Sequence, residues 1–440
     1  MGEVLIDLGE MAPRGRQQTA PPTTRRRPLS YRAVLAALTV LLIAPLTASV
    51  HRTPPLPPVI VEARLGDMTY VTRDRLFVVS AGPGPFASQV QNKVVSEYGL
   101  PGGDLRSRTS VAVFGAIFDV AAAGSTILVS YQVDTLGADA TVAFTAGTDR
   151  ALWRRPSRLV AVSEADGLVL LRENSPQFGR LNFQGVDLTT GAVRWSMQQP
   201  VRGFTTEAEY TDGFPRMLVT ATTGGDIEVR DTVSGAVTAT AKVPVRHQQT
   251  GTDVPVWPAG DLILVGAPEG TTAYTLPGLV QRWHSSADLA GRWVQPDCAT
   301  LICSLNWQGG VLALDRVTGQ RRWADPRWNY ADQAGQYLLA SANSGGRRDP
   351  MVVVLDPADG RVLGDFGPWH TIGVARPDGL VFGLHEQTLD DTVFYAVLDP
   401  ANRGVRVLGS APDVSGDCQT TGEVLICRRI DASVGIWQLK

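Results

Sequence analysis

Short apolar runs separated by polar turns recur along the chain from residue 59 to the C-terminus. Typical pairs are Leu168–Leu171 before Gly185–Leu188 and Leu262–Val265 before Thr272–Thr275. Apolar runs of this length, bounded by Gly, Pro, Asp and Asn, are typical of β-strands. No part of this region shows the sustained i, i+3, i+4, i+7 pattern of an amphipathic helix. The pattern therefore predicts an all-β domain over residues 59–440.

One segment breaks this pattern, because residues 33–50 form a stretch of 18 residues without a charged side chain. That length is close to the minimum that crosses the hydrocarbon core of a bilayer as a helix. Four Arg residues, at positions 25–27 and 32, precede the stretch, and only Arg52 closely follows it. By the positive-inside rule, the sequence predicts a single transmembrane helix over residues 31–52, with a cytoplasmic N-terminus and the large domain outside the cell membrane.

A cleaved signal peptide is the alternative for this segment. Its apolar part would end near Leu46-Thr47-Ala48, a poor match to the small-residue cleavage motif, and would follow an unusually long basic region. Lipoprotein processing is excluded, because no Cys lies near the segment. With either reading, the bulk of the chain is exported.

The segments that flank the predicted helix have biased compositions. Residues 1–30, rich in Pro, Arg and Thr after residue 12, predict a disordered cytoplasmic tail. Residues 53–58, with the sequence TPPLPP, predict a stiff polyproline-like spacer.

A nine-residue motif occurs twice within the β domain, as DLTTGAVRW and DRVTGQRRW. The conserved spacing is carried by Asp187, Gly191 and Trp195 in the first copy and by Asp315, Gly319 and Trp323 in the second. The Asp side chain can accept hydrogen bonds from backbone N–H groups in a turn. The Gly permits the positive φ of a tight turn, and the Trp can fill the space between neighbouring sheets.

Weaker and degenerate copies extend the repeat over the domain. The strands after these turns centre near residues 106, 153, 195, 238, 283, 323, 363 and 407, a pitch of about 43 residues, which matches a four-stranded propeller blade. Residues 416–440 and 59–64 supply the strands of one more blade. A literal count is therefore nine, but eight is the commoner number. We expect a β-propeller of about eight four-stranded blades, with seven to nine allowed, after one transmembrane helix.

The repeat resembles that of the quinoprotein-type, or PQQ-like, β-propellers, whose consensus is close to ALDxxTGxxxW. The best match is ALDRVTGQRRW at Ala313–Trp323, and the resemblance covers most of residues 60–440. It implies a β-propeller fold, and with the predicted transmembrane helix the chain resembles a membrane-anchored bacterial form of this family. It implies little chemistry, because this family includes both cofactor-dependent dehydrogenases and cofactor-free scaffolds. The cofactor-dependent members use adjacent cysteines, and this chain has no Cys-Cys pair, so we expect no quinone cofactor.

Charge separates the two ends of the chain. Residues 1–52 carry seven Arg and three acidic residues, a net charge of +4, and the whole chain carries −3. Residues 53–440 therefore carry about −7, which argues against a nucleic-acid partner.

The four cysteines form two local pairs within a shared DC…LIC frame. They are Cys298 with Cys303 and Cys418 with Cys427. An even number, local pairing and an exported domain favour two disulfides. A four-cysteine zinc site is the alternative, but it requires the two pairs to meet, and neither pair has the C-x-x-C spacing.

Motifs for catalysis are missing from the sequence. No G-x-S-x-G elbow, Walker loop, dinucleotide fingerprint, H-E-x-x-H motif or calcium loop occurs. The histidines are isolated, at His51, His247, His284, His370 and His385. We assign no catalytic, cofactor-binding or metal residues and expect no cofactor.

Tryptophans cluster in residues 290–370, where Trp293, Trp307, Trp323, Trp328 and Trp369 occur. We expect Trp323 to pack between blades. The other tryptophans either pack in the same way or line a ligand-binding face.

These features favour a non-catalytic scaffold, tethered to the membrane, that binds an extracytoplasmic protein or cell-envelope ligand through inter-strand loops. The alternatives are an exported enzyme, either a quinoprotein-like oxidoreductase or a glycan-acting hydrolase, and an extracytoplasmic sensor domain. An absorbance spectrum would reveal a bound quinone.

Overall fold

A computed structural model describes the β domain with gaps between its ranges. The described residues are 57–82, 91–133, 138–175, 180–245, 255–298, 300–306, 308–342, 351–387 and 391–439. Every regular element in these ranges is a strand. The predicted tail and transmembrane helix, residues 1–52, lie outside the described residues, and so do residues 53–56 of the predicted spacer. No helix of the described part is long and apolar enough to cross a membrane.

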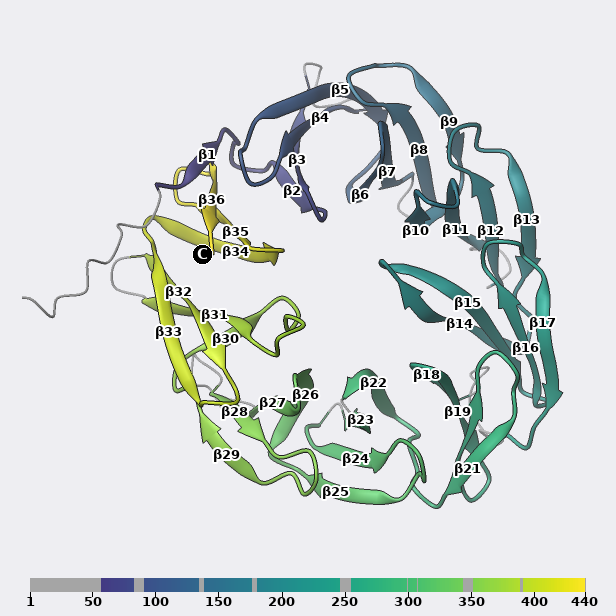
Figure 1. The fold of residues 1–440 in the computed structure, drawn as a ribbon. Coiled ribbons are helices and arrows are strands. Elements are labelled where there is room, and N and C mark those ends of the chain that lie inside the picture. The colour runs from purple at the N-terminus through teal and green to yellow at the C-terminus, as the bar shows by residue number, and fades with distance from the viewer. Residues whose placement is uncertain are drawn as a thin grey trace, which may run out of the picture. The chain divides into compact units, whose positions relative to one another are not determined.

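The strands form nine antiparallel four-stranded sheets, arranged as blades around a ring (Figure 1). Blade 1 comprises β2 (Met68–Val71), β3 (Arg75–Ala81), β4 (Gln91–Gly99) and β5 (Leu105–Val113). Blade 2 comprises β6 (Ile117–Ala123), β7 (Thr126–Gln132), β8 (Asp139–Thr145) and β9 (Ala151–Arg155). Blade 3 comprises β10 (Arg158–Ser163), β11 (Leu168–Ser175), β12 (Arg180–Asp187) and β13 (Val193–Gln198). Blade 4 comprises β14 (Gly203–Thr211), β15 (Phe214–Thr222), β16 (Asp226–Asp231) and β17 (Val237–Lys242). Blade 5 comprises β18 (Val256–Ala259), β19 (Leu262–Ala267), β20 (Gly270–Thr275) and β21 (Gln281–Ser285). Blade 6 comprises β22 (Arg292–Cys298), β23 (Leu301–Asn306), β24 (Val311–Asp315) and β25 (Arg321–Asp325). Blade 7 comprises β26 (Trp328–Ala334), β27 (Tyr337–Ala342), β28 (Val352–Leu355) and β29 (Val362–Asp365). Blade 8 comprises β30 (His370–Ile372), β31 (Val381–Gln387), β32 (Thr392–Asp399) and β33 (Gly404–Ala411). Blade 9 comprises β34 (Val414–Thr421), β35 (Val424–Arg429), β36 (Val434–Gln438) and β1 (Val59–Val61).

The propeller therefore has nine blades, one more than the expected eight and within the expected range of seven to nine. Blade 9 is composite, because its outer strand β1 comes from the start of the domain and pairs with β36. Val59, Ile60 and Val61 lie opposite Ile436, Gly435 and Val434. The literal count of turns and strands had contained this blade.

The core of the domain lies between the blades. The described residues form nine apolar clusters, one at each junction between neighbouring blades. Strand β19 shows how one strand serves two junctions. Its Ile263 and Val265 pack in the cluster shared with blade 4, whereas Leu262 and Leu264 pack in the cluster shared with blade 6. Because both faces of such a strand are buried, its sequence is a continuous apolar run rather than an alternating one.

Antiparallel pairing places two kinds of connection at the same end of the ring. The turns from inner to second strand and from third to outer strand lie at this end, which we call the turn face. The repeat motifs of the sequence form the turns from third to outer strand, such as the turn between β12 and β13. The inner strands β22, β26 and β30 line the central space, as Figure 1 shows.

Each predicted cysteine pair lies at disulfide distance, and both pairs join an inner strand to the second strand of its blade. The Cα atoms are 5.8 Å apart for Cys298 and Cys303, between β22 and β23, and 4.1 Å apart for Cys418 and Cys427, between β34 and β35. The pairing register shifts at both places, so the shared frame forms a bulge in the inner strand. The pairs belong to blades 6 and 9, and the four-cysteine zinc site is not formed.

We expect the Cys418–Cys427 disulfide to stabilise the ring more than Cys298–Cys303 does. It closes the longer loop, with a sequence separation of 9 rather than 5, and it lies in the composite blade. The loop-entropy model gives about 2–3 kcal/mol for each. In the Cys298→Ala/Cys303→Ala variant, reductant breaks only Cys418–Cys427, and the complementary variant isolates the other pair. Chemical denaturation with and without reductant measures both losses, and a larger loss for Cys298–Cys303 would contradict the expected order.

Candidate functional site

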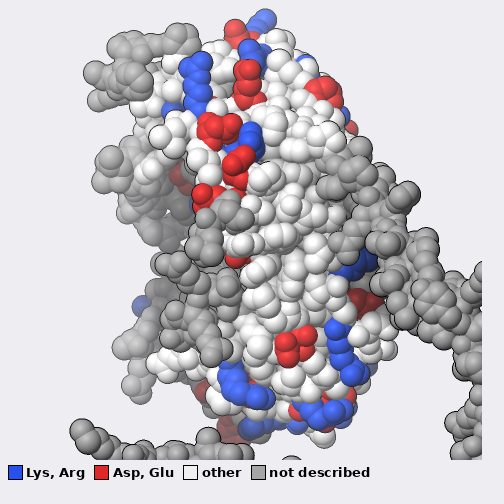
Figure 2. All heavy atoms as spheres, turned by 90° about the vertical axis from the view of Figure 1, so that its left-hand side faces the viewer, with Lys and Arg blue, Asp and Glu red and all other residues white. Residues whose placement is uncertain are grey.

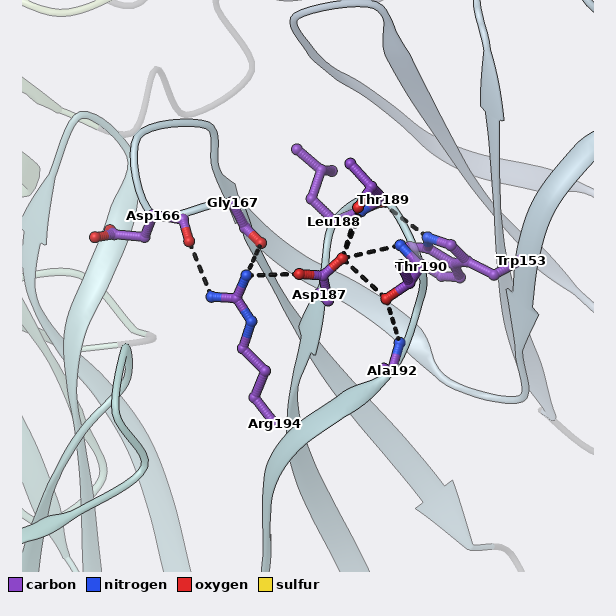
Figure 3. A network of polar contacts seen from close by, with 9 residues as sticks. All are labelled: Trp153, Asp166, Gly167, Asp187, Leu188, Thr189, Thr190, Ala192 and Arg194. Atoms are coloured by element: carbon purple, nitrogen blue, oxygen red, sulfur yellow. Dashed lines mark hydrogen bonds and ion pairs between the residues drawn. The ribbon is translucent and has the colours of Figure 1, made fainter.

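The strongest sequence motif forms a tightly hydrogen-bonded turn (Figure 3). Asp187 Oδ1 accepts hydrogen bonds from the backbone N–H groups of Thr189 and Thr190, at 3.1 and 2.9 Å. It also accepts hydrogen bonds from the hydroxyl groups of the same two residues, at 2.8 and 2.9 Å. Arg194 donates to Asp187 Oδ2 at 2.7 Å and to the carbonyl oxygens of Asp166 and Gly167. Arg194, with the hydroxyl and amide donors, holds the pKa of the Asp187 carboxyl well below its usual range. Both carboxylate oxygens of Asp187 therefore accept hydrogen bonds from donors of the same blade.

The same turn receives the tryptophan of the preceding blade. Trp153 Nε1 donates to the Leu188 carbonyl oxygen at 2.9 Å, and its ring lies against Gly191. Gly191 has φ +66°, and a Cβ atom there would lie 2.5 Å from Trp153 Cγ. Glycine is therefore required twice, by the backbone conformation and by the ring.

This contact recurs at three further junctions in the described residues. The other donor and acceptor pairs are Trp195 with Thr232, Trp283 with Arg316 and Trp323 with Pro357, at 2.9–3.0 Å. The residue opposite each tryptophan on the third strand is small, as with Gly185 opposite Trp195 and Ala313 opposite Trp323. The structure thus places Gly191, Trp195, Gly319 and Trp323 at four different blade junctions. Asp187 and Asp315 instead hold the turns of their own blades.

A different region brings polar side chains of several blades together. A pocket of about 470 Å³ lies where the inner strands of blades 6, 7 and 8 approach the turn face. Its lining residues are Gln295, Asp332, Gln333, Gly335, Leu339, Thr371, Gly373, Val374, Ala375, Arg376, Pro377 and Val381. The volume is that of a small-molecule site, and such sites combine apolar walls with a few polar groups.

One wall of the pocket is the connection between β30 and β31, residues 373–380, which projects toward the ring centre in Figure 1. Blade 7 supports this loop, because a Cβ atom on Gly379 would lie 2.9 Å from the Gly335 Cα atom. Blade 9 contacts the start of the loop from the other side. Thr420 donates to the carbonyl oxygen of Ile372, the last residue of β30, at 3.4 Å, and its side chain lies against Gly373. The wall is therefore held by both neighbouring blades.

The polar groups of the pocket are connected across the blades. Gln295 Nε2 of blade 6 donates to Asp332 Oδ1 of blade 7. The Tyr330 hydroxyl of blade 7 and the Thr371 hydroxyl of blade 8 are 3.1 Å apart. A tyrosine hydroxyl is neutral at physiological pH, and burial raises the pKa of Tyr330 further above its usual range.

The tryptophans of residues 290–370 divide into two groups. Trp323, Trp328 and Trp369 are buried, at 8%, 4% and 9% exposure, whereas Trp293 is 63% exposed. Trp307 lies outside the described residues. Trp293 lies two residues before Gln295 on β22 and therefore on the same face of this strand. Only this described member of the cluster is free to contact a ligand.

The pocket residues carry no sequence motif, and sequence reasoning missed Gln295, Asp332, Thr371 and Arg376. They come from three blades, so no spacing in the chain relates them. One signal was present, because the eight-residue connection GVARPDGL is longer than the tight turns at the equivalent place in blades 2, 4 and 5.

Within the described ranges, no group of side chains is arranged as a metal site, and the described histidines named here make separate contacts. No group of three or more His, Cys, Asp or Glu side chains there is arranged to hold a metal ion. His385 lies between two aromatic rings, 5.7 Å from Trp369 and 6.5 Å from Phe394 between ring centroids. His284 Nδ1 is 3.0 Å from the Thr272 hydroxyl, and His51 and His247 lie outside the described residues.

The outer wall of the ring carries a second distinct surface. Figure 2 shows that charged side chains are sparse over the middle of the side formed by blades 8 and 9. Ile60, Val405 and Val407 are exposed there, at 45%, 38% and 54%. These residues stand on the outer strands β1 and β33.

Comparison with known proteins indicates the fold. No protein-family model and no curated protein matches this chain. Among solved structures, a eukaryotic initiation factor is 13% identical over 84% of this chain and 94% of its own, with a TM-score of 0.51. BamB from Moraxella catarrhalis is 17% identical over 87% and 98%, with a TM-score of 0.42. The C-terminal WD40 domain of Sif2 is 11% identical over 86% and 100%, with a TM-score of 0.39. At these identities the likeness concerns the fold alone, and the chain is a β-propeller.

Proposed function

We propose that this chain is a non-catalytic binding scaffold of the PQQ-like propeller type, tethered to the cell membrane with its propeller outside. The observation that carries the proposal is the pocket at the turn face, where residues of blades 6, 7 and 8 converge. The exposed Trp293 lies two residues before the lining residue Gln295 on β22. A ligand or partner that binds there contacts three blades at once. The PQQ-like assignment rests on the match of Ala313–Trp323 to the consensus.

Membrane attachment and orientation are supported by the uncharged residues 33–50 and the Arg residues that precede them. The two disulfide pairs support an oxidising compartment outside the cytoplasm. The tail of residues 1–30 then lies in the cytoplasm, and the spacer of residues 53–58 separates membrane and propeller.

Site-specific photo-crosslinking in intact cells tests the scaffold proposal. A photoreactive residue replaces Val374, which lines the pocket and is 88% exposed, and a control replaces Val280, which is 65% exposed at a turn of blade 5. We expect a discrete adduct at Val374 and none at Val280. Equal labelling at both positions, or none at Val374, would show that the pocket is not the binding surface.

A fusion after Lys440 tests the orientation in the same cells. A reporter that functions only outside the cytoplasm is expected to be active, and a cytoplasm-only reporter inactive. The reverse pattern would place the propeller in the cytoplasm.

A further inference from the structure

We infer that the pocket of blades 6, 7 and 8 binds a neutral saccharide, an inference that rests on the proposed function and names the ligand class of the same site. Its lining includes polar side chains with complementary roles. Gln295 and Gln333 supply amides, Asp332 a carboxylate and Thr371 a hydroxyl. A sugar hydroxyl both donates and accepts, and this mixture of groups satisfies both functions at once.

The charge of the pocket selects against anionic ligands. Arg376 is the one cation among the lining residues, and its guanidinium lies 3.2 Å from the Asp378 carboxylate and 3.9 Å from that of Glu423. Two acids outside the lining thus offset its charge. Asp332 adds a carboxylate to the lining itself. The pocket offers no net positive charge to pair with the carboxylate of a sialic or uronic acid, whereas an uncharged sugar needs no such partner.

The exposed ring of Trp293 supplies the apolar part of the recognition. Trp293 and Gln295 share one face of β22, and their backbone positions are about 7 Å apart along the strand. Val294, on the opposite face, packs toward blade 5, so Trp293 and Gln295 face blade 7, where Asp332 lies. A pyranose has an apolar C–H face and a hydroxyl rim. Stacked on the indole, it directs its hydroxyl groups toward the amides and the carboxylate.

A peptide ligand fits these contacts less well. Extended peptides are recognised chiefly by main-chain hydrogen bonds to the edge of a sheet. Here Gln295, Asp332 and Thr371 offer side-chain groups to a ligand. One wall is a loop closed by its own main-chain hydrogen bonds, from the Arg376 N–H to the Leu380 carbonyl oxygen and from the Gly379 N–H to the Arg376 carbonyl oxygen. Both contacts use main-chain groups that a bound peptide would need.

The site is also held in shape before a ligand binds. The Gln295–Asp332 hydrogen bond joins blades 6 and 7, and the Tyr330 and Thr371 hydroxyl groups join blades 7 and 8. The Cys298–Cys303 disulfide fixes the bulge three residues beyond Gln295 on β22. Ordering these groups in advance reduces the conformational entropy lost on binding.

The test uses the full chain, purified in a detergent without a sugar headgroup, on an array of oligosaccharides. The array holds neutral chains of hexoses and N-acetylhexosamines, with sialylated and uronic-acid chains for comparison. We expect binding to neutral chains and not to the anionic set. Trp293→Ala should weaken this binding by about tenfold or more, whereas Trp293→Phe keeps an aromatic ring and most of the affinity. Val317→Ala, an equally exposed position at 62% in the same blade, is the control and should leave binding unchanged.

Three outcomes overturn the inference. These are an array without bound neutral chains, preference for the anionic chains, and binding that Trp293→Ala does not affect. Binding of extended peptides from a random library, lost in Trp293→Ala, would assign the pocket to a protein partner instead. Photo-crosslinking at Val374 separates the two proposals: adducts to a protein together with a blank array refute the saccharide alone, whereas absence of any adduct refutes the scaffold site.

Discussion

Replacing Trp323 by Ala is expected to lower the free energy of unfolding by about 3–5 kcal/mol, the range for large buried aromatic side chains. Trp323 is 8% exposed and packs among residues of blades 6 and 7. The substitution empties that space and leaves the Pro357 carbonyl oxygen without the indole N–H. Trp195→Ala should act similarly at the junction of blades 3 and 4. Chemical denaturation of the full chain measures both effects.

Trp293→Ala is the matched control, because the same atoms are removed from the same blade at a side chain that is 63% exposed. Its effect on the free energy of unfolding should stay within about 0.5 kcal/mol, as for ordinary surface positions. If Trp323→Ala and Trp293→Ala proved equally mild, the repeat tryptophan would not be a blade-packing residue.

The role of the repeat motif could be predicted from the sequence because each of its contacts is local or depends on one neighbouring blade. Asp187 binds amides two and three residues further along, so spacing alone suggests the turn. The partner of the tryptophan was not visible in the sequence. Trp153 and Leu188 are 35 residues apart, and only the stacking of one blade on the next brings the indole to the carbonyl oxygen.

The number of blades and the pocket were harder to predict for the same reason. The sequence analysis joined residues 59–64 with residues 416–440 in one blade, and the pairing of β1 with β36 confirms this. A three-residue strand more than 370 residues from its partner carries little pattern of its own, so the commoner number of eight was preferred to the literal count of nine. The pocket depends on β22, β26 and β30 meeting at angles set by the blade packing. Polar residues such as Gln295 and Thr371 are ordinary at single strand positions, so only their convergence marks them as candidates.

Closure of the ring through β1 leads to the second large expected effect. Val61 is 2% exposed and packs with Leu76 and Val78 of blade 1 and with Ile426 and Ile436 of blade 9. Val61→Asp places a carboxyl group in this apolar cluster, where an uncompensated charge costs about 3–5 kcal/mol. We expect the free energy of unfolding to fall by that amount at neutral pH. Hydrogen exchange should show β36 losing protection first, because β1 covers its edge.

Ile60→Asp provides the control on the adjacent residue. Ile60 points to the opposite face of β1 and is 45% exposed, so the charge stays in water and the loss should be below about 1 kcal/mol. The pH dependence separates burial of charge from loss of packing. Burial raises the pKa of the carboxyl introduced by Val61→Asp above its unfolded value of about 3.9. The folded state then holds its proton more tightly, so the penalty is smallest below about pH 4 and grows as the pH rises toward the raised folded pKa. A penalty for Val61→Asp that is independent of pH and no larger than that for Ile60→Asp would show that β1 does not close the ring.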